Sequence, residues 1–400
     1  CELAENAVLP ISLNKFSIID HKDLLKVGSR IEEIMASYGA EFPGLGGLTA
    51  RDIHELKENL LRSLGFVKRL STQIQHDEHV YIRLTNEQYE TFSQSLDNRF
   101  IVVNGVAGSG KTIIAKELAK EFASQGKRAL LLCFNKPISS ALWYELKEYS
   151  QDRLINVFRY HQFAKRIIDD DEWWEKAQMA YKASKKISEF WDLAIPEKLL
   201  DIPDENLQKY DAIIVDEGQD FREFWFETLL RHLSDDGHFI VFLDKNQDIF
   251  NHYTQLPKQH HFMSFNLRRN CRNGKNIIQY LTENTGISII PFDSLPSGDY
   301  QLRRYKNDVE QKKMIRDDIL SLIREDNIDP SQILILLHSD IRESCLKDMR
   351  KVDKYEIEST YNRNANGNSI KYATIDYFKG LEADVVLLTD THLVESEERK

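Results

Sequence analysis

Short apolar runs alternate with stretches of helical periodicity through much of this 400-residue chain. The runs at 100–104, 129–134, 155–158, 212–216 and 239–244 are rich in β-branched and aliphatic residues. Their lengths are those of buried strands, and amphipathic helical patterns follow them. Strands that alternate with helices predict a parallel sheet wound by right-handed crossovers.

The same pattern begins again after residue 265 and predicts a second α/β unit. A helix is expected near 273–283, and a second, longer helix is expected at 307–325. A further helix is expected from residue 340. The predicted strands of this unit lie at 300–305, 333–337, 372–375 and 384–388.

Two other segments break the alternation. Residues 165–205 are helical, charged and rich in aromatic residues, which predicts a helical insertion in the first unit. Trp173, Trp174 and Trp191 are expected to form the core of this insertion rather than a binding surface. Residues 1–80 mix short helical patterns with Gly- and Pro-containing loops and predict a connector or accessory region. The predicted domains are therefore 81–265 and 266–400, preceded by that connector.

Composition narrows the class of protein. With 42% hydrophobic and 29% charged residues, the chain has the composition of a globular protein of two or three domains. The net charge of −11 does not indicate nucleic-acid binding, although a local basic groove is compatible with it. The four cysteines lack metal-site spacing and are expected to be reduced thiols. No apolar run approaches the ~20 residues that span a bilayer, and no signal-peptide pattern occurs.

A phosphate-binding motif lies between the first predicted strand and its helix. "GVAGSGKT" at 105–112 fits GxxxxGK[ST] in the strand–loop–helix context that this motif requires. Its glycines let backbone N–H groups turn toward phosphates, and the helix N-terminus adds a positive dipole. Lys111 is expected to reach the β- and γ-phosphates, and the Thr112 hydroxyl to ligate Mg²⁺. The nucleotide-binding residues expected here are Gly105, Gly108, Ser109, Gly110, Lys111 and Thr112.

Acidic residues end a neighbouring strand, at the edge of the sheet where ligands bind in such folds. Asp216 is expected to hold Mg²⁺, and Glu217 to polarise an attacking water. A lone acid in this position is often only a helix cap. The adjacent pair favours hydrolysis over transfer to another acceptor.

Two further polar residues each have two interpretations. Gln247, after the strand at 239–244, can orient the attacking water, or it can be an ordinary surface residue. Arg272 belongs to a basic loop with Arg268 and Arg269. It can neutralise charge at the γ-phosphate, or it can be a solvated loop residue.

Taken in order, eight segments over about 84–390 resemble the motifs of superfamily 1 helicases of the UvrD/Rep type. The resemblance implies two RecA-like domains with ATP and Mg²⁺ in the cleft between them. It assigns adenine recognition to Gln88, proximity to the γ-phosphate to Gly380 and proximity to the ribose to Glu382. The segments are "LTNEQYETF" (84–92), "GVAGSGKT", "LLLCFNKPIS" (130–139), "VFRYHQF" (157–163), "VDEGQD" (215–220), "LDKNQDIF" (243–250), "LRRNCRN" (267–273) and "TIDYFKGLEADVV" (374–386).

The same resemblance implies a nucleic-acid partner. Phe134, Asn135, Tyr160 and His161 fall at positions that contact a single strand in the family. The implied activity is that of an ATP hydrolase that moves along single-stranded nucleic acid, with DNA and 3′-to-5′ movement favoured by the relatives. Two alternatives stay open: an ATP-gated nucleic-acid sensor or assembly module, for instance in defence against foreign DNA, and a P-loop kinase.

Within the family, the segments around 131–135, 216–221 and 270–273 look closest to helicases that follow an N-terminal nuclease-related (NERD) domain. The resemblance therefore implies a cytoplasmic, prokaryotic protein, with a nuclease domain as a possible neighbour in the full chain. The chain departs from the family at Gly218, Cys271 and Asp376. Motif VI and its arginine are not found, so the sequence is expected to be an excerpt that is weak in hydrolysis by itself.

Overall fold

The computed structural model describes residues 70–151, 154–244, 256–360 and 368–391. The chain divides into two compact units, 1–67 and 68–400, and every described residue lies in the second. The connector predicted over 1–80 therefore lies largely outside the described residues. Residues 70–80 belong to a helix, α3 (Leu70–Ser93), which runs through the expected boundary at 80 without interruption.

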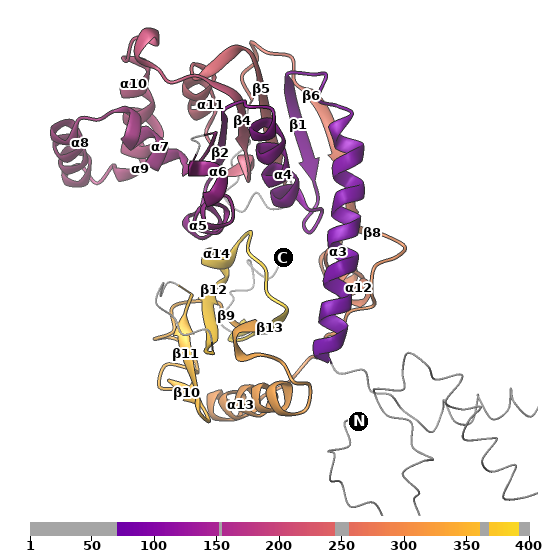
Figure 1. Cartoon of the computed structure of the whole chain (residues 1–400). Helices are drawn as coiled ribbons and strands as arrows, with labels where there is room; N and C mark the ends of the chain where they lie inside the picture. Colours follow the sequence, from indigo (N-terminus) through magenta and orange to yellow (C-terminus); the bar gives the residue numbers. More distant parts are fainter. Residues whose placement is uncertain (1–69, 152–153, 245–255, 361–367, 392–400) are drawn as a thin grey trace, which may run out of the picture. The chain divides into compact units, whose positions relative to one another are not determined.

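Six parallel strands form the first sheet, and five of them lie at the apolar runs that predicted strands. The order is β3-β2-β4-β5-β1-β6, so the strand before the phosphate motif lies between two others (Figure 1). Crossover connections of this kind need a helix between strands. The strands are β1 (Phe100–Gly105), β2 (Ala129–Cys133), β3 (Ile155–Arg159), β4 (Tyr210–Val215), β5 (Leu233–Leu243) and β6 (Met263–Leu267).

Helices cover both faces of this sheet. Because side chains alternate along a strand, Leu131 of β2 packs toward α4 (Lys111–Ser124) and α5 (Lys136–Glu145), while its neighbour Leu132 packs toward the other face. That other face is covered by α7 (Tyr160–Ile167) and α11 (Glu223–Leu230). Burial on both faces explains why all five residues of β2 are buried.

The predicted helical insertion is present between β3 and β4. It contains α8 (Asp171–Ala183), α9 (Ile187–Glu189), a π-helical turn (Phe190–Ala194) and α10 (Ile195–Leu200). Trp174 is buried against Phe190, and Trp173 and Trp191 pack partly on the same cluster. The expectation that these tryptophans form the core of the insertion is confirmed.

Five strands form the second sheet, in the order β10-β11-β12-β9-β13. All neighbours pair in parallel except β10 with β11 at the edge. A short parallel pair, β7 (Arg269–Asn270) and β8 (Ile290–Pro291), stands apart. The remaining elements are β9 (Ile333–Leu337), β10 (Lys351–Val352), β11 (Tyr355–Ser359), β12 (Ile370–Thr374), β13 (Val385–Leu388), α6 (Lys147–Gln151), α12 (Lys275–Thr285), α13 (Asp308–Arg324), α14 (Ile375–Phe378) and short 3₁₀ turns at 204–206, 218–220 and 330–332.

Two predicted elements of this second part are wrong. Residues 300–305 form no strand; Leu302 is 69% exposed, and no neighbouring strand pairs with the segment. The helix expected from residue 340 is replaced by successive turns. The Ser344 hydroxyl accepts a hydrogen bond from the Leu346 N–H and donates one to Asp390, and such local bonds compete with the helical ladder. Strands β6, β7, β8, β10 and β11 were not expected.

The predicted α/β fold class is otherwise confirmed. The α3 helix adds a feature that the pattern did not indicate, since its residues join three hydrophobic clusters. Leu70 and Ile74 pack against the core of the second sheet, Leu84 against α12, and Phe92 against the core of the first sheet. Among the described residues, no helix combines the length and apolar character needed to cross a membrane.

Candidate functional site

The phosphate loop turns sharply between β1 and α4 because two of its glycines adopt left-handed backbone angles. Gly108 has φ 71° and Gly110 has φ 82°, values that side chains with a Cβ rarely adopt. At Gly108 a Cβ would also lie 2.3 Å from Nδ2 of Asn270. Position 108 therefore requires glycine both for its backbone angle and for lack of space.

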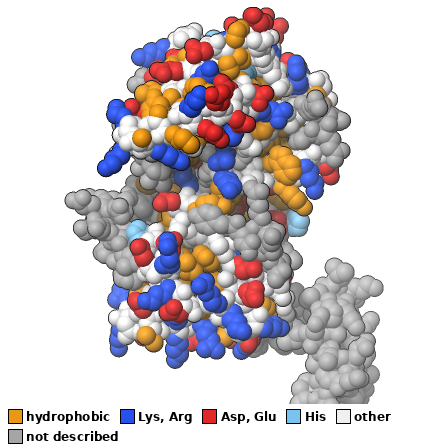
Figure 2. All heavy atoms as spheres, turned by 90° about the vertical axis from the view of Figure 1, so that its left-hand side faces the viewer, with side chains coloured by type: hydrophobic (Ala, Val, Ile, Leu, Met, Phe, Trp, Pro, Cys, Tyr) orange, Lys and Arg blue, Asp and Glu red, His pale blue; other side chains and the backbone are white. Residues whose placement is uncertain are grey.

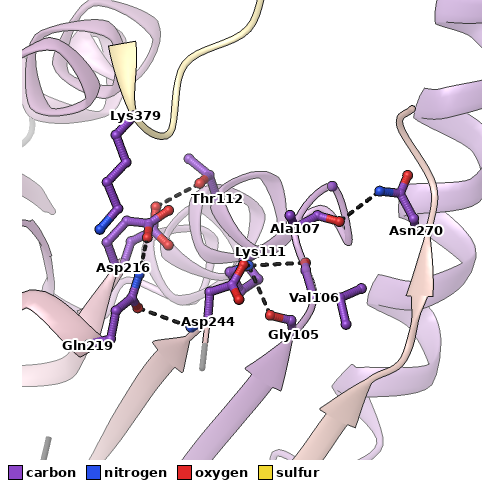
Figure 3. Close-up of polar contacts among 12 residues, drawn as sticks. Gly105, Val106, Ala107, Lys111, Thr112, Asp216, Gln219, Asp244, Asn270 and Lys379 are labelled. Atoms are coloured by element: carbon purple, nitrogen blue, oxygen red, sulfur yellow. Dashed lines mark hydrogen bonds and ion pairs between the residues drawn. The ribbon is translucent and has the colours of Figure 1, made fainter. Parts of the chain in front are cut away.

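The lysine of the loop is buried and already neutralised. Lys111 Nζ lies 3.0 Å from Asp244 Oδ2, and it donates hydrogen bonds to the carbonyls of Gly105 at 3.1 Å and Val106 at 3.2 Å (Figure 3). The side chains of Lys111 and Asp244 are only 6% and 1% exposed. Asp244 at the end of β5 thus supplies the counter-charge for the ammonium group that the sequence assigned to the phosphates.

The hydroxyl of Thr112 and the carboxylate of Asp216 form one polar unit. Thr112 Oγ1 donates to Asp216 Oδ2 at 2.7 Å. Asp216 is fully buried, and its Oδ1 has no hydrogen-bond partner among the described residues. Burial raises the pKa of Asp216. A buried, unsatisfied carboxylate oxygen beside a hydroxyl fits Mg²⁺, which takes hard oxygen ligands and obtains its other ligands from water and phosphate.

The next residue has the environment of a general base. Glu217 is 5% exposed and has a left-handed backbone with φ 53°, which is uncommon outside glycine. Burial, followed by the negative charge of Asp216, raises the pKa of Glu217 to about 7. The side chain of Gln219 connects this carboxylate to the lysine pair, because Nε2 donates to Glu217 and Oε1 accepts from the Asp244 N–H at 3.0 Å.

A loop of the second sheet reaches this carboxylate. Lys379 Nζ lies 2.9 Å from both oxygens of Asp220, and Asn135 Nδ2 donates to the Lys379 carbonyl at 2.7 Å. The next residue, Gly380, has φ 79°. A Cβ built there would lie 3.5 Å from Glu217 Oε1 and 2.3 Å from Ile138 Cδ1. Gly380 therefore packs tightly against Ile138, and a side chain at position 380 would reach van der Waals distance of Glu217, the residue that the sequence assigns to water activation.

The basic segment after β6 contacts the phosphate loop directly. Asn270 Nδ2 donates to the Ala107 carbonyl at 2.7 Å, and the Cys271 N–H donates to the Gly108 carbonyl at 2.9 Å. Arg272 is partly buried, which lowers its pKa to about 10, and it forms an ion pair with Glu382. The arginine and the glutamate that the resemblance placed around the nucleotide are thus paired with each other.

Helix α3 contributes the residues beside that segment. Gln88 is 8% exposed, and its Nε2 donates to the Arg269 carbonyl at 3.2 Å. Its Oε1 is buried without a partner among the described residues. Thr85 Oγ1 lies 3.4 Å from the Cys271 sulfur. The side chain expected to recognise adenine therefore retains one unused acceptor.

The four residues expected to contact nucleic acid differ in exposure. Phe134 is 38% exposed, and its ring stacks on Trp225 with centroids 6.3 Å apart. Tyr160 is 1% exposed. Its ring also stacks on Trp225, with centroids 4.3 Å apart, and its hydroxyl forms a hydrogen bond with the Thr228 hydroxyl. Its ring belongs to the core, so direct base stacking on Tyr160 does not fit this conformation.

His161 and Asn135 are also largely engaged. Burial and the nearby Arg159 charge lower the pKa of His161 to about 4, so its ring is neutral at pH 7. His161 packs edge-on against Trp191 and Trp225. The Asn135 side chain caps α5 by accepting from the Ile138 N–H, in addition to binding the Lys379 carbonyl. Of these four residues, Phe134 presents the most accessible ring.

The structure brings most of the expected nucleotide residues together. Lys111, Thr112, Asp216, Glu217 and Gly380 share one polar site, whereas Gln247 lies outside the described residues. The sequence analysis missed four participants. Asp244 follows an apolar run, as Asp216 does, and this signal could have identified it. No comparable signal marks Gln219, Asn270 or Lys379, whose roles depend on the tertiary fold.

Comparison with known proteins finds a family match that includes the phosphate loop. Residues 88–252 match a family described as "AAA domain". No curated protein matches the chain. A structure of two coordinating Pif1 helicases at forked double-stranded DNA is 13% identical, with 64% of this chain and 54% of that chain covered and a TM-score of 0.29.

Two other solved structures show similarity of the same order. Bacteroides Pif1 bound to single-stranded DNA is 13% identical over 58% of this chain and 56% of that chain, with a TM-score of 0.25. AMPPCP-bound DnaA from Aquifex aeolicus is 14% identical over 63% and 68%, with a TM-score of 0.23. The chain spans about half of the Pif1 chains, at 54% and 56%. The region that matches the family model, 88–252, contains the phosphate loop, Lys111 and the Thr112–Asp216 pair.

Proposed function

We propose that the chain is the ATP-driven part of a protein that moves along single-stranded nucleic acid, with DNA as the favoured substrate. The observation that carries the proposal is the buried Lys379–Asp220 ion pair, reinforced by the hydrogen bond from Asn135 to the Lys379 carbonyl. The ion pair joins the loop before β13 to the carboxylates after β4. A nucleotide bound by the phosphate loop would therefore be sensed by both sheets, which is what conversion of hydrolysis into movement requires.

The residues divide the chemistry of ATP hydrolysis among them. Lys111 would exchange its contact with Asp244 for the β- and γ-phosphates, with the loop N–H groups assisting. Glu217, with a pKa near 7, would accept the proton of the attacking water. Arg272 would neutralise charge that develops on the γ-phosphate. Gln247 is proposed to orient the water, and Gln88 Oε1 and Glu382 to recognise adenine and ribose.

A divalent cation fits beside these groups. Thr112 and Asp216 would hold Mg²⁺, with the buried Oδ1 of Asp216 as the available ligand. When bound, the ion would neutralise phosphate charge and orient the phosphate oxygens. The water-activating role of Glu217 and the charge of Lys111 belong to the protein itself.

The proposal of a nucleic-acid partner rests on the resemblance to strand-contacting motifs and on one exposed aromatic ring. Phe134 follows β2 at the edge of the sheet where ligands bind in such folds, and its ring is supported from below by Trp225. Asn135, Tyr160 and His161 would act by positioning rather than by stacking. A nuclease-related domain in the full chain remains part of the proposal.

The proposal is tested by measuring ATP hydrolysis with and without single-stranded oligonucleotides, followed by a translocation assay on labelled DNA. We expect strand-stimulated hydrolysis and directional displacement of a bound streptavidin. Stimulated hydrolysis without displacement would favour the ATP-gated sensor instead. Transfer of the γ-phosphate to an acceptor other than water would favour a kinase and contradict the proposal.

A further inference from the structure

Helix α5 presents two aromatic rings to solvent, and neither ring has a role in the site described above. Trp143 is 53% exposed and Tyr144 is 65% exposed, although large aromatic side chains are usually buried or half-buried. The opposite face of the helix supplies Ile138 and Leu142 to the core of the first sheet. The exposed rings are therefore not required to hold α5 in place.

Basic side chains flank the two rings. Lys136 and Lys147 are exposed. Lys136 lies two turns before Trp143 on the same side of α5, and Lys147 begins the next helix, α6, three residues after Tyr144. Lys147 Nζ lies 4.3 Å from the centroid of the Tyr144 ring. The nearby Glu145 is directed to Lys116, at 2.6 Å, so its charge is compensated.

The position of α5 connects this face to the proposed site. The helix begins at Lys136, directly after Phe134 and the cap residue Asn135, at the carboxyl end of β2. At a rise of about 1.5 Å per residue, Trp143 lies roughly 10 Å along α5 from Lys136 at the start of the helix. Figure 2, in which the left-hand side of Figure 1 faces the viewer, shows hydrophobic side chains interspersed with Lys, Arg, Asp and Glu.

Aromatic rings with lysines close in sequence favour one kind of occupant. A protein partner is expected at a continuous apolar patch, whereas the exposed neighbours here are mostly polar: Ser140, Glu145, Glu148 and the two lysines, with Tyr149 39% exposed. Single-stranded nucleic acid combines flat bases, which stack on aromatic rings, with phosphates, which attract ammonium groups. We propose that Trp143 and Tyr144 form a second base-stacking site for single-stranded nucleic acid, with Lys136 and Lys147 binding its phosphates. This inference rests on the proposed function.

The test measures binding of a fluorescein-labelled oligo-dT to the 400-residue chain by anisotropy. We expect W143A/Y144A to bind about ten- to a hundredfold more weakly, because each base–aromatic stack contributes substantially to affinity. The variant W143F/Y144F should bind within about threefold of the wild type, since it keeps the rings. Val309→Ala, which truncates a 79% exposed side chain on α13, serves as the matched control and should have no effect.

Two further measurements, tryptophan fluorescence and the salt dependence of Kd, distinguish base stacking and phosphate contacts from a general loss of folded structure. Trp143 is the exposed one among the five tryptophans, so oligo-dT should quench part of the intrinsic fluorescence in the wild type and less in Trp143→Phe. Lys136→Ala and Lys147→Ala should each reduce the slope of log Kd against log salt by about 0.7. Unchanged nucleotide binding in all these variants would show that they are folded.

The outcomes distinguish the inference from the function on which it rests. Wild-type protein that does not bind oligo-dT at all would overturn both. Wild-type binding that W143A/Y144A retains in full would overturn the α5 site alone. A double variant that loses self-association in sedimentation while keeping its affinity for oligo-dT would identify α5 as a protein-docking face and also overturn the inference.

Discussion

Lys111 of the phosphate loop and Asp244, directly after β5, form a buried ion pair of 3.0 Å. The positive charge of Lys111 is compensated by Asp244 as long as this pair is intact. A bound phosphate therefore competes with the Asp244 carboxylate for the ammonium group. Removing the carboxylate leaves a buried charge without compensation, which destabilises the protein by several kcal/mol, on the order of 3. A phosphate then supplies the missing negative charge.

We therefore expect Asp244→Asn to lower the melting temperature of the nucleotide-free protein and to bind nucleotide several-fold more tightly. The measurement is a titration with a fluorescent ATP analogue together with thermal unfolding with and without the analogue. The stabilisation by nucleotide should be larger in the variant than in the wild type. Weaker binding by Asp244→Asn would mean that the carboxylate assists the bound nucleotide.

The elevated pKa of Glu217 predicts a pH dependence of hydrolysis. As a general base, the side chain acts only when deprotonated, so kcat should rise from pH 6 to pH 8 with its midpoint near the pKa of about 7. Glu217→Gln should reduce kcat by at least about a hundredfold while nucleotide binding is kept. A rate that does not change between pH 6 and pH 8 would remove the base role from Glu217.

The same shift affects stability with a defined sign. Because the folded-state pKa is raised above the ordinary 4.5, the folded protein binds this proton more tightly than the unfolded chain. The resulting stabilisation is fully present below about pH 4.5 and is lost as the pH rises through about 7. Glu217→Gln should thus be more stable than the wild type at pH 8, on the order of 2 kcal/mol, and this advantage should vanish near pH 4.5. Urea unfolding at both pH values measures the difference.

The phosphate loop and the carboxylates after β4 could be predicted from sequence because their chemistry is local. A glycine-rich turn, a lysine and a threonine lie within eight residues, and Asp216 and Glu217 directly follow a strand. Strands β1 to β5 could be predicted for a similar reason, since burial on both faces of the sheet leaves a continuous apolar run in each.

What the sequence did not reveal depends on distant parts of the chain. Tyr160 matches a strand-contacting motif by position, yet α11 places Trp225 against its ring. Lys379 is one lysine among many until the fold sets it beside Asp220, which is 159 residues away. The turns after residue 340 depend on Asp390, whose carboxylate competes for Ser344.

Gly380 offers a test of how closely the second sheet must approach Glu217. Gly380→Ala introduces a Cβ that would lie 2.3 Å from Ile138 Cδ1, in addition to the strain of a φ of 79°. We expect kcat to fall at least about tenfold, because displacement of the loop moves it away from Glu217. Gly126→Ala is the matched control, since Gly126 has φ 73° and nothing within 4 Å of its Cβ position.

Both alanine variants should lose about 1 kcal/mol of stability from backbone strain. Only Gly380→Ala should also lower kcat. Equal kinetic effects in the two variants would show that the tight packing at Gly380 has no part in catalysis. The measurements are steady-state ATP hydrolysis and urea denaturation of each variant.

Arg272 has a predicted role that its pairing with Glu382 makes testable. Arg272→Ala should reduce kcat by about a thousandfold and leave the Kd for nucleotide within about threefold, as expected for a group that acts on the transition state. The exposed Arg268 provides the control, and Arg268→Ala should be silent. Loss of nucleotide binding alone in Arg272→Ala would argue against a role at the γ-phosphate.

The Lys379–Asp220 pair should be worth more than an ordinary surface ion pair. Its side chains are 13% and 4% exposed, and the ammonium group contacts both carboxylate oxygens at 2.9 Å. Removing one partner leaves the other charge buried and should cost about 3–5 kcal/mol, whereas removing both should cost less than the sum. We expect Lys379→Met and Asp220→Asn each to destabilise strongly and the double variant to recover at least about 1 kcal/mol.

The exposed pair Arg303–Asp318 is the natural control, with a distance of 3.0 Å and exposures of 53% and 29%. The same double-mutant cycle there should give a coupling of less than about 1 kcal/mol. Because Lys379 directly precedes Gly380, its removal should also lower kcat without changing nucleotide affinity, and Asn135→Ala should act in the same direction through the lost bond to the Lys379 carbonyl. A coupling at Lys379–Asp220 no larger than at Arg303–Asp318 would mean that the loop is held near Glu217 by the packing of Gly380 on Ile138, and then Ile138→Ala would be the variant that lowers kcat.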